Sequence, residues 1–304
     1  MKDHIASDPM RPEVHWTNLT PREIAARRRQ RGLRMSVRVV RQLLRRHHYV
    51  RRKARKAQPM GQHQDRDAQF QNIARLKQEY QDSPNPILSI DTKKKELLGN
   101  FYRDGCLYTQ PIVTTWDHDF PSAADGKLIP HGIYDVKRHA AYRNLGLSHD
   151  TSEFACESIY QWWCAVGRDL YPAATSILIL CDGGGSNSAT HYLFKEDLQK
   201  LADRMGIALR VAHYPPYCSK YNPIEHRVFP HVTRACQGLI FTTLAVPVAA
   251  MAKTQTRTGL QVVVNVIDKV YQTGRKVAEG FRESRRIVFD AVLPKWNYTA
   301  VPTG

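Results

Sequence analysis

The stretch at residues 176–187 reads SILILCDGGGSN, and it is the strongest indication of the fold in this chain. The run of apolar residues from Ile177 to Cys181 is typical of a central strand that is covered on both faces of a sheet. Asp182 ends this strand, and open α/β sheets place their sites at the carboxyl edge. We therefore expect an α/β layer architecture with a site near Asp182.

Helical and extended patterns alternate on both sides of this strand. Apolar residues at helical spacing predict helices, and shorter apolar runs between turn formers predict strands. The resulting order, β-β-β-α-β-α-β-α, corresponds to a mixed sheet with flanking helices. The expected elements are three strands within residues 87–116 with turns near Lys94 and near Asp104 and Gly105, helices over 152–170 and 188–204, a strand over 208–214 and a helix from Pro223.

Three acids occupy positions in this layout that favour a shared site. Asp91 lies in or just after the first strand, Asp182 ends the apolar strand, and Glu225 falls in the first turn of the helix that opens NPIEHR. Adjacent strands and a helix packed behind them can bring such acids together. Each acid also has a plainer interpretation, because aspartates at strand ends often form turns and Glu225 can complement the helix dipole.

Clustered carboxylates cannot all stay ionised without a compensating cation. Hard divalent metals such as Mg²⁺ or Mn²⁺ provide that charge and prefer oxygen ligands. Two such ions, about 3.5–4 Å apart, clamp the attacking and leaving oxygens of a phosphodiester. We therefore expect Asp91, Asp182 and Glu225 to be catalytic and to hold two metal ions.

Several neighbours of these acids are candidate supporting residues. Gly183 and Gly184 let backbone and substrate approach closely after Asp182, although a simple flexible turn explains them equally well. No GK[ST] follows, so these glycines do not form a Walker loop. Further candidates are Asn187, which can orient Asp182 or a phosphate, and Asn222. His226 and Lys220 flank Glu225 and can touch phosphate or orient Glu225, and His226 can also ligate a metal. Lys94 is either a DNA contact or a solvated side chain.

The positive charge of the chain is concentrated near its N-terminus. The whole sequence carries a formal net charge of +17. Residues 21–57 contain 15 Lys and Arg against one acid, Glu23, and leave 30 basic and 27 acidic side chains elsewhere. This excess indicates a polyanionic partner, either nucleic acid or an anionic membrane surface. A membrane surface is disfavoured because the sequence offers no amphipathic anchor.

The same basic residues have the pattern of a helix-turn-helix. Thr20 and Glu23 form a capping box, Gly32 ends a first helix and Ser36 caps a second. Such a pair, coated with arginine, predicts double-stranded DNA as the partner. A solvated helical hairpin is the alternative, although solvated surfaces normally mix both signs of charge. The candidate DNA-binding residues are Arg27, Arg28, Arg31, Arg34, Arg38, Arg41, Arg45, Arg51, Arg52 and Lys53.

Several classes of protein are disfavoured. No run approaches the ~18 apolar residues of a membrane span, and MKDHIASDPM lacks the apolar stretch of a secretory signal. The six cysteines form no CxxC pair, in a chain too large to need disulfide staples. We therefore expect a reduced, cytoplasmic protein without a zinc site or a membrane partner.

Shifts in composition divide the chain. Residues 65–81 carry apolar side chains at helical spacing, and the SPNP at 83–86 ends that pattern. The expected division is a basic helix-turn-helix region at 1–57, a helical linker at 58–84, and a catalytic domain with a C-terminal extension at 85–304.

Four stretches resemble the DDE transposases of bacterial insertion sequences: SIDTKKKELLGNF, HDTSEFACESIYQWW, YPAATSILILCDGGGSN and PPYCSKYNPIEHRVF. The sequence is similar to the Rhodopirellula-type, or ISAzo-type, transposase domain from about Pro21 to the C-terminal NYTAVP. The resemblance implies a ribonuclease-H-like, retroviral-integrase-like core preceded by an all-α helix-turn-helix. It also implies that the Asp-Asp-Glu triad of the family falls on Asp91, Asp182 and Glu225.

The resemblance further implies metal-dependent DNA cleavage and strand transfer at the ends of an insertion sequence, by a nucleoid-associated bacterial protein. Two ends must be joined, so a homodimer or higher oligomer is expected by analogy. Two alternatives stay open. One is a repressor of the element or an inactive remnant, which binds DNA without cutting it. The other is a host nuclease for RNA–DNA hybrids or junctions, which the helix-turn-helix pattern disfavours.

This sequence departs from the family pattern in three places. Family members begin further upstream, so we expect an N-terminally truncated chain. The segment CSKYNPIEH differs from the usual TSKWN-type motif, although Asn222 and Glu225 are retained. Residues 233–250 also differ from the family pattern. These departures keep open a catalytically impaired copy.

Overall fold

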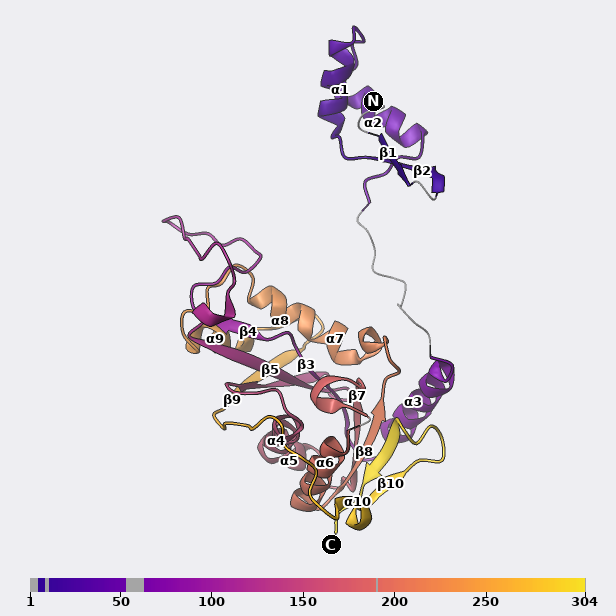
Figure 1. Cartoon of the computed structure of the whole chain (residues 1–304), viewed down its shortest axis with the longest axis vertical. Helices are drawn as coiled ribbons and strands as arrows, with labels where there is room; N and C mark the ends of the chain where they lie inside the picture. Colours follow the sequence, from indigo (N-terminus) through magenta and orange to yellow (C-terminus); the bar gives the residue numbers. More distant parts are fainter. Residues whose placement is uncertain (1–4, 9–10, 53–62, 190, 304) are drawn as a thin grey trace. The chain divides into compact units, whose positions relative to one another are not determined.

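The computed structural model describes residues 5–8, 11–52, 63–189 and 191–303 (Figure 1). These residues form two compact units, Met1–Gln58 and Pro59–Gly304. The second unit therefore includes most of residues 58–84, for which the sequence predicts a helical linker.

The first unit consists of a hairpin and two helices. Strand β1 (Ile5–Asp8) pairs antiparallel with β2 (Arg11–Thr17), so this region is not all-α as expected. Val14, Trp16 and Thr17 have high β-propensity, which explains the second strand locally. The capping box of Thr20 and Glu23 is confirmed at the start of α1 (Pro21–Gln30).

The two helices meet over a small core. Gly32 adopts the left-handed conformation, with φ at +81°, in the turn between α1 and α2 (Val37–Arg46). Ser36 caps α2 as expected, by accepting a hydrogen bond from the backbone N–H of Val39. Ile24, Ala25 and Val40 are the buried residues of this core. The assignment of this helix pair as a DNA-binding helix-turn-helix stays a prediction.

A mixed sheet of nine strands forms the centre of the second unit within the described residues. Its order is β10-β11-β8-β7-β3-β5-β6-β9, with β4 paired to β5. β3 is parallel to β7 and antiparallel to β5. The strands are β3 (Ile87–Thr92), β4 (Glu96–Leu98), β5 (Gly126–Asp135), β6 (Ala140–Gly146), β7 (Ser176–Cys181), β8 (Ala208–His213), β9 (Gln261–Ile267), β10 (Ile287–Phe289) and β11 (Asn297–Ala300).

Helices cover both faces of this sheet (Figure 1). Helices α4 and α6 pack on one face of the central strands, and α3 packs on the other face of β7 and β8. Helices α7 to α9 cover β5, β6 and β9. The helices are α3 (Arg66–Gln81), α4 (Ser152–Trp162), α5 (Arg168–Leu170), α6 (Tyr192–Met205), α7 (Pro223–Arg227), α8 (Phe229–Ala235), α9 (Ala245–Ala252) and α10 (Phe281–Ser284), with a π-helical turn Trp163–Gly167 joining α4 to α5.

The expectation of three strands within residues 87–116 is wrong. β3 and β4 lie there, but residues 99–125 have no strand, and the next two strands are β5 and β6. The β-branched run PIVTT was misleading because Ile112 and Val113 are exposed and have no strand to pair with. β5 was overlooked because Pro130 and Gly132 suggest a turn, whereas pairing with strands on both sides stabilises an extended conformation.

Candidate functional site

Asp91 and Asp182 lie side by side at the ends of neighbouring parallel strands. Asp91 is the penultimate residue of β3, and Asp182 directly follows β7. Ser89 pairs with Leu180, so the same register continued by two residues places Asp91 beside Asp182. Side chains alternate along a strand, which places Ser89 and Asp91 on one face of β3 and the core residues Leu88 and Ile90 on the other. The sequence pattern therefore predicted this juxtaposition correctly.

Two buried polar side chains hold the first turn of α7 against β3. Asn222 donates its side-chain amide to the carbonyl oxygen of Ile90 at 3.0 Å. The Ser89 hydroxyl donates to the Asn222 carbonyl oxygen at 2.5 Å and accepts the backbone N–H of Ile224 at 2.9 Å. Asn222 was an expected supporting residue. Ser89 was missed, although a serine in an otherwise apolar strand needs a buried partner.

Gly132 gives α7 the room to approach the sheet. It lies opposite Asp91 on β5. A Cβ at this position would stand 2.7 Å from Ile224 Cδ1, which would have to shift, and a tight 3.0 Å from the Phe229 ring. A glycine therefore lets the helix that carries Glu225 cross the strand without displacing Ile224.

The carboxylates are close enough to raise one another's pKa. The pKa of Asp91 is raised to about 8 by burial, by the charge of Asp182, and by a hydrogen bond to Glu225 and its charge. A hydrogen bond from the Thr92 N–H to Asp91 Oδ1, at 2.7 Å, lowers the pKa of Asp91 but offsets only part of this rise. Burial and the charge of Glu225 likewise raise the pKa of Asp182. The structure thus brings the three expected acids together.

Asp150 is a fourth acid beside this group, and it was not predicted from the sequence. Its charge contributes to the raised pKa of Asp182. Its carboxylate also accepts a hydrogen bond from the Thr92 hydroxyl at 3.2 Å. The available signal was the HDTSEF stretch, where Asp150 precedes Thr151, the N-cap of α4.

A buried pair from β8 and β11 supports the backbone of Asp182. His213 Nδ1 donates to the Asp182 carbonyl at 2.9 Å, so Nε2 accepts from the Tyr298 hydroxyl at 2.8 Å. Burial lowers the pKa of His213 to about 4, which keeps the ring neutral and fixes this direction of hydrogen bonding. Neither residue is near Asp182 in sequence, and no local pattern could have identified them.

The donor set fits a hard divalent cation. In the described part of the chain, no Lys, Arg or His forms an ion pair with Asp91, Asp182 or Glu225, and none lowers the pKa of the two aspartates. The cluster therefore lacks a positive counter-charge from the protein itself. Within the same residues, no three His, Cys, Asp or Glu side chains already stand in a metal-ligand arrangement.

The other residues expected from the sequence to support the site differ in their burial. Asn187 is buried with its side-chain oxygen unpartnered, whereas Gly183, Gly184, His226, Lys94 and Lys220 are exposed. A Cβ on Gly184 would meet no atom within 4 Å, so the protein itself does not require that glycine. The third glycine, Gly185, does adopt a positive φ, of +60°.

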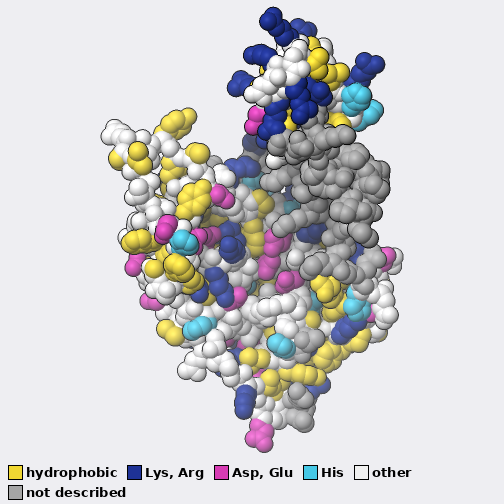
Figure 2. All heavy atoms as spheres, turned by 45° about the horizontal axis from the view of Figure 1, so that its top comes forward, with side chains coloured by type: hydrophobic (Ala, Val, Ile, Leu, Met, Phe, Trp, Pro, Cys, Tyr) yellow, Lys and Arg dark blue, Asp and Glu magenta, His cyan; other side chains and the backbone are white. Residues whose placement is uncertain are grey.

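The expected DNA-binding arginines cover the first unit, and Figure 2 shows Lys and Arg side chains crowding its surface. Arg28 is half-buried, and Lys53 lies outside the described residues. The exposed ones are Arg27, Arg31, Arg34, Arg38, Arg41, Arg45, Arg51 and Arg52.

A family model described as the Rhodopirellula transposase DDE domain matches residues 1–302. The chain belongs to this transposase family. The match confirms the resemblance in the sequence and extends it to the first residue. The central strands β8-β7-β3-β5-β6, with β5 alone antiparallel to its neighbours, have the ribonuclease-H-like arrangement expected for a DDE transposase.

Solved structures of Mos1 transposase are also similar. A paired-end complex with the left transposon end is 16% identical, with a TM-score of 0.46, and the match covers 75% of this chain and 64% of that one. A mariner Mos1 paired-end complex with Mg is 14% identical, with a TM-score of 0.47 and coverage of 79% and 73%. These scores lie below 0.5, so membership rests on the family model.

No curated protein matches the chain. Among the described residues, no helix is long and apolar enough to cross a membrane.

The raised pKa of Asp91 predicts how the metal-free protein responds to pH. The folded state binds more protons than the unfolded state between the ordinary value of 3.8 and about 8. The free energy of unfolding therefore falls as pH rises through this window. We expect Mg²⁺ or Mn²⁺ to raise the Tm, and to raise it more at pH 8 than at pH 5. Differential scanning fluorimetry across pH, with and without metal, measures both effects.

Asp91→Asn is expected to flatten the pH profile of the metal-free protein and to reduce the metal-induced rise in Tm. Asp169→Asn, at an exposed acid on α5, is the matched control. Equal pH profiles for the wild type and Asp91→Asn would contradict the assignment of this titration to the cluster.

Gly132→Ala is expected to destabilise the fold by about 1–3 kcal/mol, because the new methyl group displaces Ile224. The shift moves Glu225, so the metal-induced rise in Tm should also shrink. Gly126→Ala is the control, since a Cβ there meets Leu98 at an ordinary 3.4 Å. Urea unfolding and metal titration measure the two effects, and equal results for both variants would contradict the close approach of α7.

Proposed function

We propose that this chain is a metal-dependent transposase that cleaves DNA at the ends of an insertion sequence and joins those ends to target DNA. The observation that carries the proposal is the cluster of Asp91, Asp182 and Glu225, which repel one another and lack a counter-charge from the protein. Family membership supports it.

Asp91, Asp182 and Glu225 would hold Mg²⁺ or Mn²⁺, and two ions are expected from the number of acids. Bound divalent ions would lower the pKa of the attacking water or hydroxyl, and they would stabilise the leaving oxygen of a phosphodiester. Burial and the neighbouring carboxylates raise the pKa of Asp91, so binding of a divalent cation would displace a proton from this group.

The surrounding residues position these carboxylates. Ser89 and Asn222 fix the turn that carries Glu225, and His213 fixes the backbone of Asp182. A protein nucleophile is not needed. Cys181, next to Asp182, is fully buried, which raises its thiol pKa well above the usual value and keeps it protonated.

The first unit supports a proposal for the partner, double-stranded DNA. Most of its arginines are exposed, and residues 21–57 carry 15 Lys and Arg against one acid. A solvated hairpin would mix acids with these bases. Binding of both ends of the insertion sequence favours a homodimer or larger assembly. Because the proposed substrate is bacterial DNA, we expect the protein in the cytoplasm, associated with the nucleoid.

Asp182→Asn should lower DNA nicking at least about 100-fold, because it removes one charged ligand from the group. Supercoiled plasmid that carries the DNA flanking the gene, incubated with Mg²⁺ or Mn²⁺, reports the nicking. Asp169→Asn should cut like the wild type.

Unchanged nicking by Asp182→Asn would overturn the triad assignment. Binding of this DNA by the wild type without nicking in either metal would identify a repressor or inactive remnant instead. Cleavage restricted to RNA–DNA hybrids would identify a host nuclease.

Replacement of Arg38, Arg41 and Arg45 on α2 by Gln should weaken DNA binding and its salt dependence. Each lost phosphate contact reduces the slope of log K against log salt by about 0.9. Fluorescence anisotropy at several salt concentrations measures this slope. Arg168→Gln, at an exposed arginine of the second unit, is the control, and an unchanged slope in the triple variant is the contrary result.

A further inference from the structure

Lys195, in the first turn of α6, is enclosed by the protein. It is 4% exposed, and among the described residues it is the only buried lysine. No Asp or Glu in the described part of the chain forms an ion pair with it. Burial and the charge of Arg285 lower the pKa of its amine to about 8. Burial of a charge without an acidic partner costs free energy, so a lysine at this position calls for an explanation.

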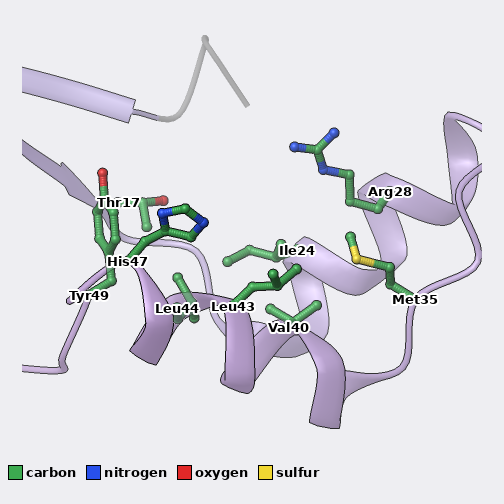
Figure 3. A pocket seen from close by; sticks show the side chains of 9 residues that line it. All are labelled: Thr17, Ile24, Arg28, Met35, Val40, Leu43, Leu44, His47 and Tyr49. Carbon is green, nitrogen blue, oxygen red and sulfur yellow. The ribbon is translucent and has the colours of Figure 1, made fainter.

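Basic side chains beside the apolar groove of the first unit are not enclosed in this way. This groove is a cavity of about 310 Å³ between α1 and α2, lined by apolar side chains such as Ile24 and Val40 (Figure 3). Arg28 beside it is only half-buried and His47 is exposed, so water can solvate both polar groups. Lys195 is almost completely shielded from water, and its amine therefore depends on protein partners.

The amine of Lys195 holds the end of the loop that follows Asp182, residues 183–189, which we call the glycine loop. Lys195 Nζ donates a hydrogen bond to the carbonyl oxygen of Ala189 at 2.6 Å. The backbone N–H of Ala189 in turn donates to the carbonyl oxygen of Gly183 at 3.3 Å. The two ends of the glycine loop are therefore joined to each other, and Lys195 fixes them to α6.

The glycine loop and Lys195 both connect to Asp182. The backbone N–H of Gly184 donates a hydrogen bond to the Asp182 carboxylate, which lowers the pKa of Asp182 and favours the ionised form that binds a cation. Lys195 Nζ also lies 4.4 Å from the centre of the Tyr298 ring. The hydroxyl of Tyr298 donates to His213, which holds the backbone carbonyl of Asp182. Lys195 thus contacts both of the structures that hold Asp182.

We propose that Lys195 is a positioning residue, whose amine holds the glycine loop in the conformation in which Asp182 binds a metal ion. Lysine suits this role because a charged donor forms a hydrogen bond roughly twice as strong as a neutral one. Lys195 acts through the loop and not on the metal. The inference rests on the metal-binding function proposed above, because the position of Asp182 matters for binding only if the carboxylate cluster holds a cation.

A positioning role and a purely structural role predict different effects of Lys195→Met on stability. The variant loses the hydrogen bond to Ala189, but it also removes a charge whose burial is costly. We therefore expect the Tm without metal to change by less than about 3 °C. A lysine that served only to stabilise the fold would give a large fall in Tm.

Hydrogen exchange of the full chain without metal or DNA tests whether Lys195 holds the loop. In Lys195→Met, amides of residues 183–189 should exchange at least about 10-fold faster, as expected on loss of one hydrogen bond from a charged donor. Amides of β3 should exchange as in the wild type. Lys195→Gln keeps an N–H donor without the charge and should lie between the two. Lys200→Met is the matched control, on the same helix at an exposed side chain.

Mn²⁺ titration by calorimetry tests the consequence for the site. Lys195→Met should raise the Kd for Mn²⁺ about 10–100-fold, and Lys200→Met should leave it unchanged. Unchanged exchange of the glycine loop, or a normal Mn²⁺ affinity in Lys195→Met, would overturn the role of Lys195 alone. A large fall in Tm with faster exchange throughout the sheet would show a structural role and overturn it equally. A wild type that binds no Mn²⁺ would overturn the proposed function, and this inference with it.

Discussion

Asp91 and Asp182 repel each other when both are ionised, and the sheet gives them no freedom to separate. They end neighbouring parallel strands at the centre of the sheet, and both strands are covered by helices on their two faces. Moving the strands apart would expose Leu88, Ile90 and Ile179, which are completely buried. The apolar core therefore holds an electrostatically unfavourable arrangement in place, which is a common property of functional sites. A divalent cation would convert the same repulsion into binding energy.

The third acid depends on a different kind of constraint. Glu225 lies on a helix of a single turn, which has little stability of its own. Its position follows from the Ser89 and Asn222 hydrogen bonds and from the absence of a side chain at Gly132. Polar groups buried at this point direct the helix more strictly than apolar packing would, because misplacement would leave them unsatisfied. These buried hydrogen bonds and the glycine thus independently determine the position of the Glu225 carboxylate.

The sequence predicted those parts of the fold whose signal is local. The apolar run before Asp182, the helical periodicity of residues 152–170 and the caps at Thr20 and Ser36 all correspond to elements of the structure. The failures have a tertiary cause. β5 contains Pro130 and Gly132 and is extended because strands pair with it on both sides, whereas the β-branched residues 112–115 found no partner. His213 and Tyr298 act through a contact 85 residues apart, which no local pattern reveals.

The segment of residues 233–250 is part of the packing behind α7. Residues 233–250 include Cys236, Phe241 and Ala250, all of which are buried in the cluster that also holds Ile224 and Phe229. Phe241 further supports the base of the 99–125 loop through Arg103, and its backbone carbonyl accepts the N–H of Gly99 at 2.8 Å. Residues 233–250 therefore supply the packing behind the helix that carries Glu225, and a polar side chain at one of these buried positions would disturb the placement of that helix.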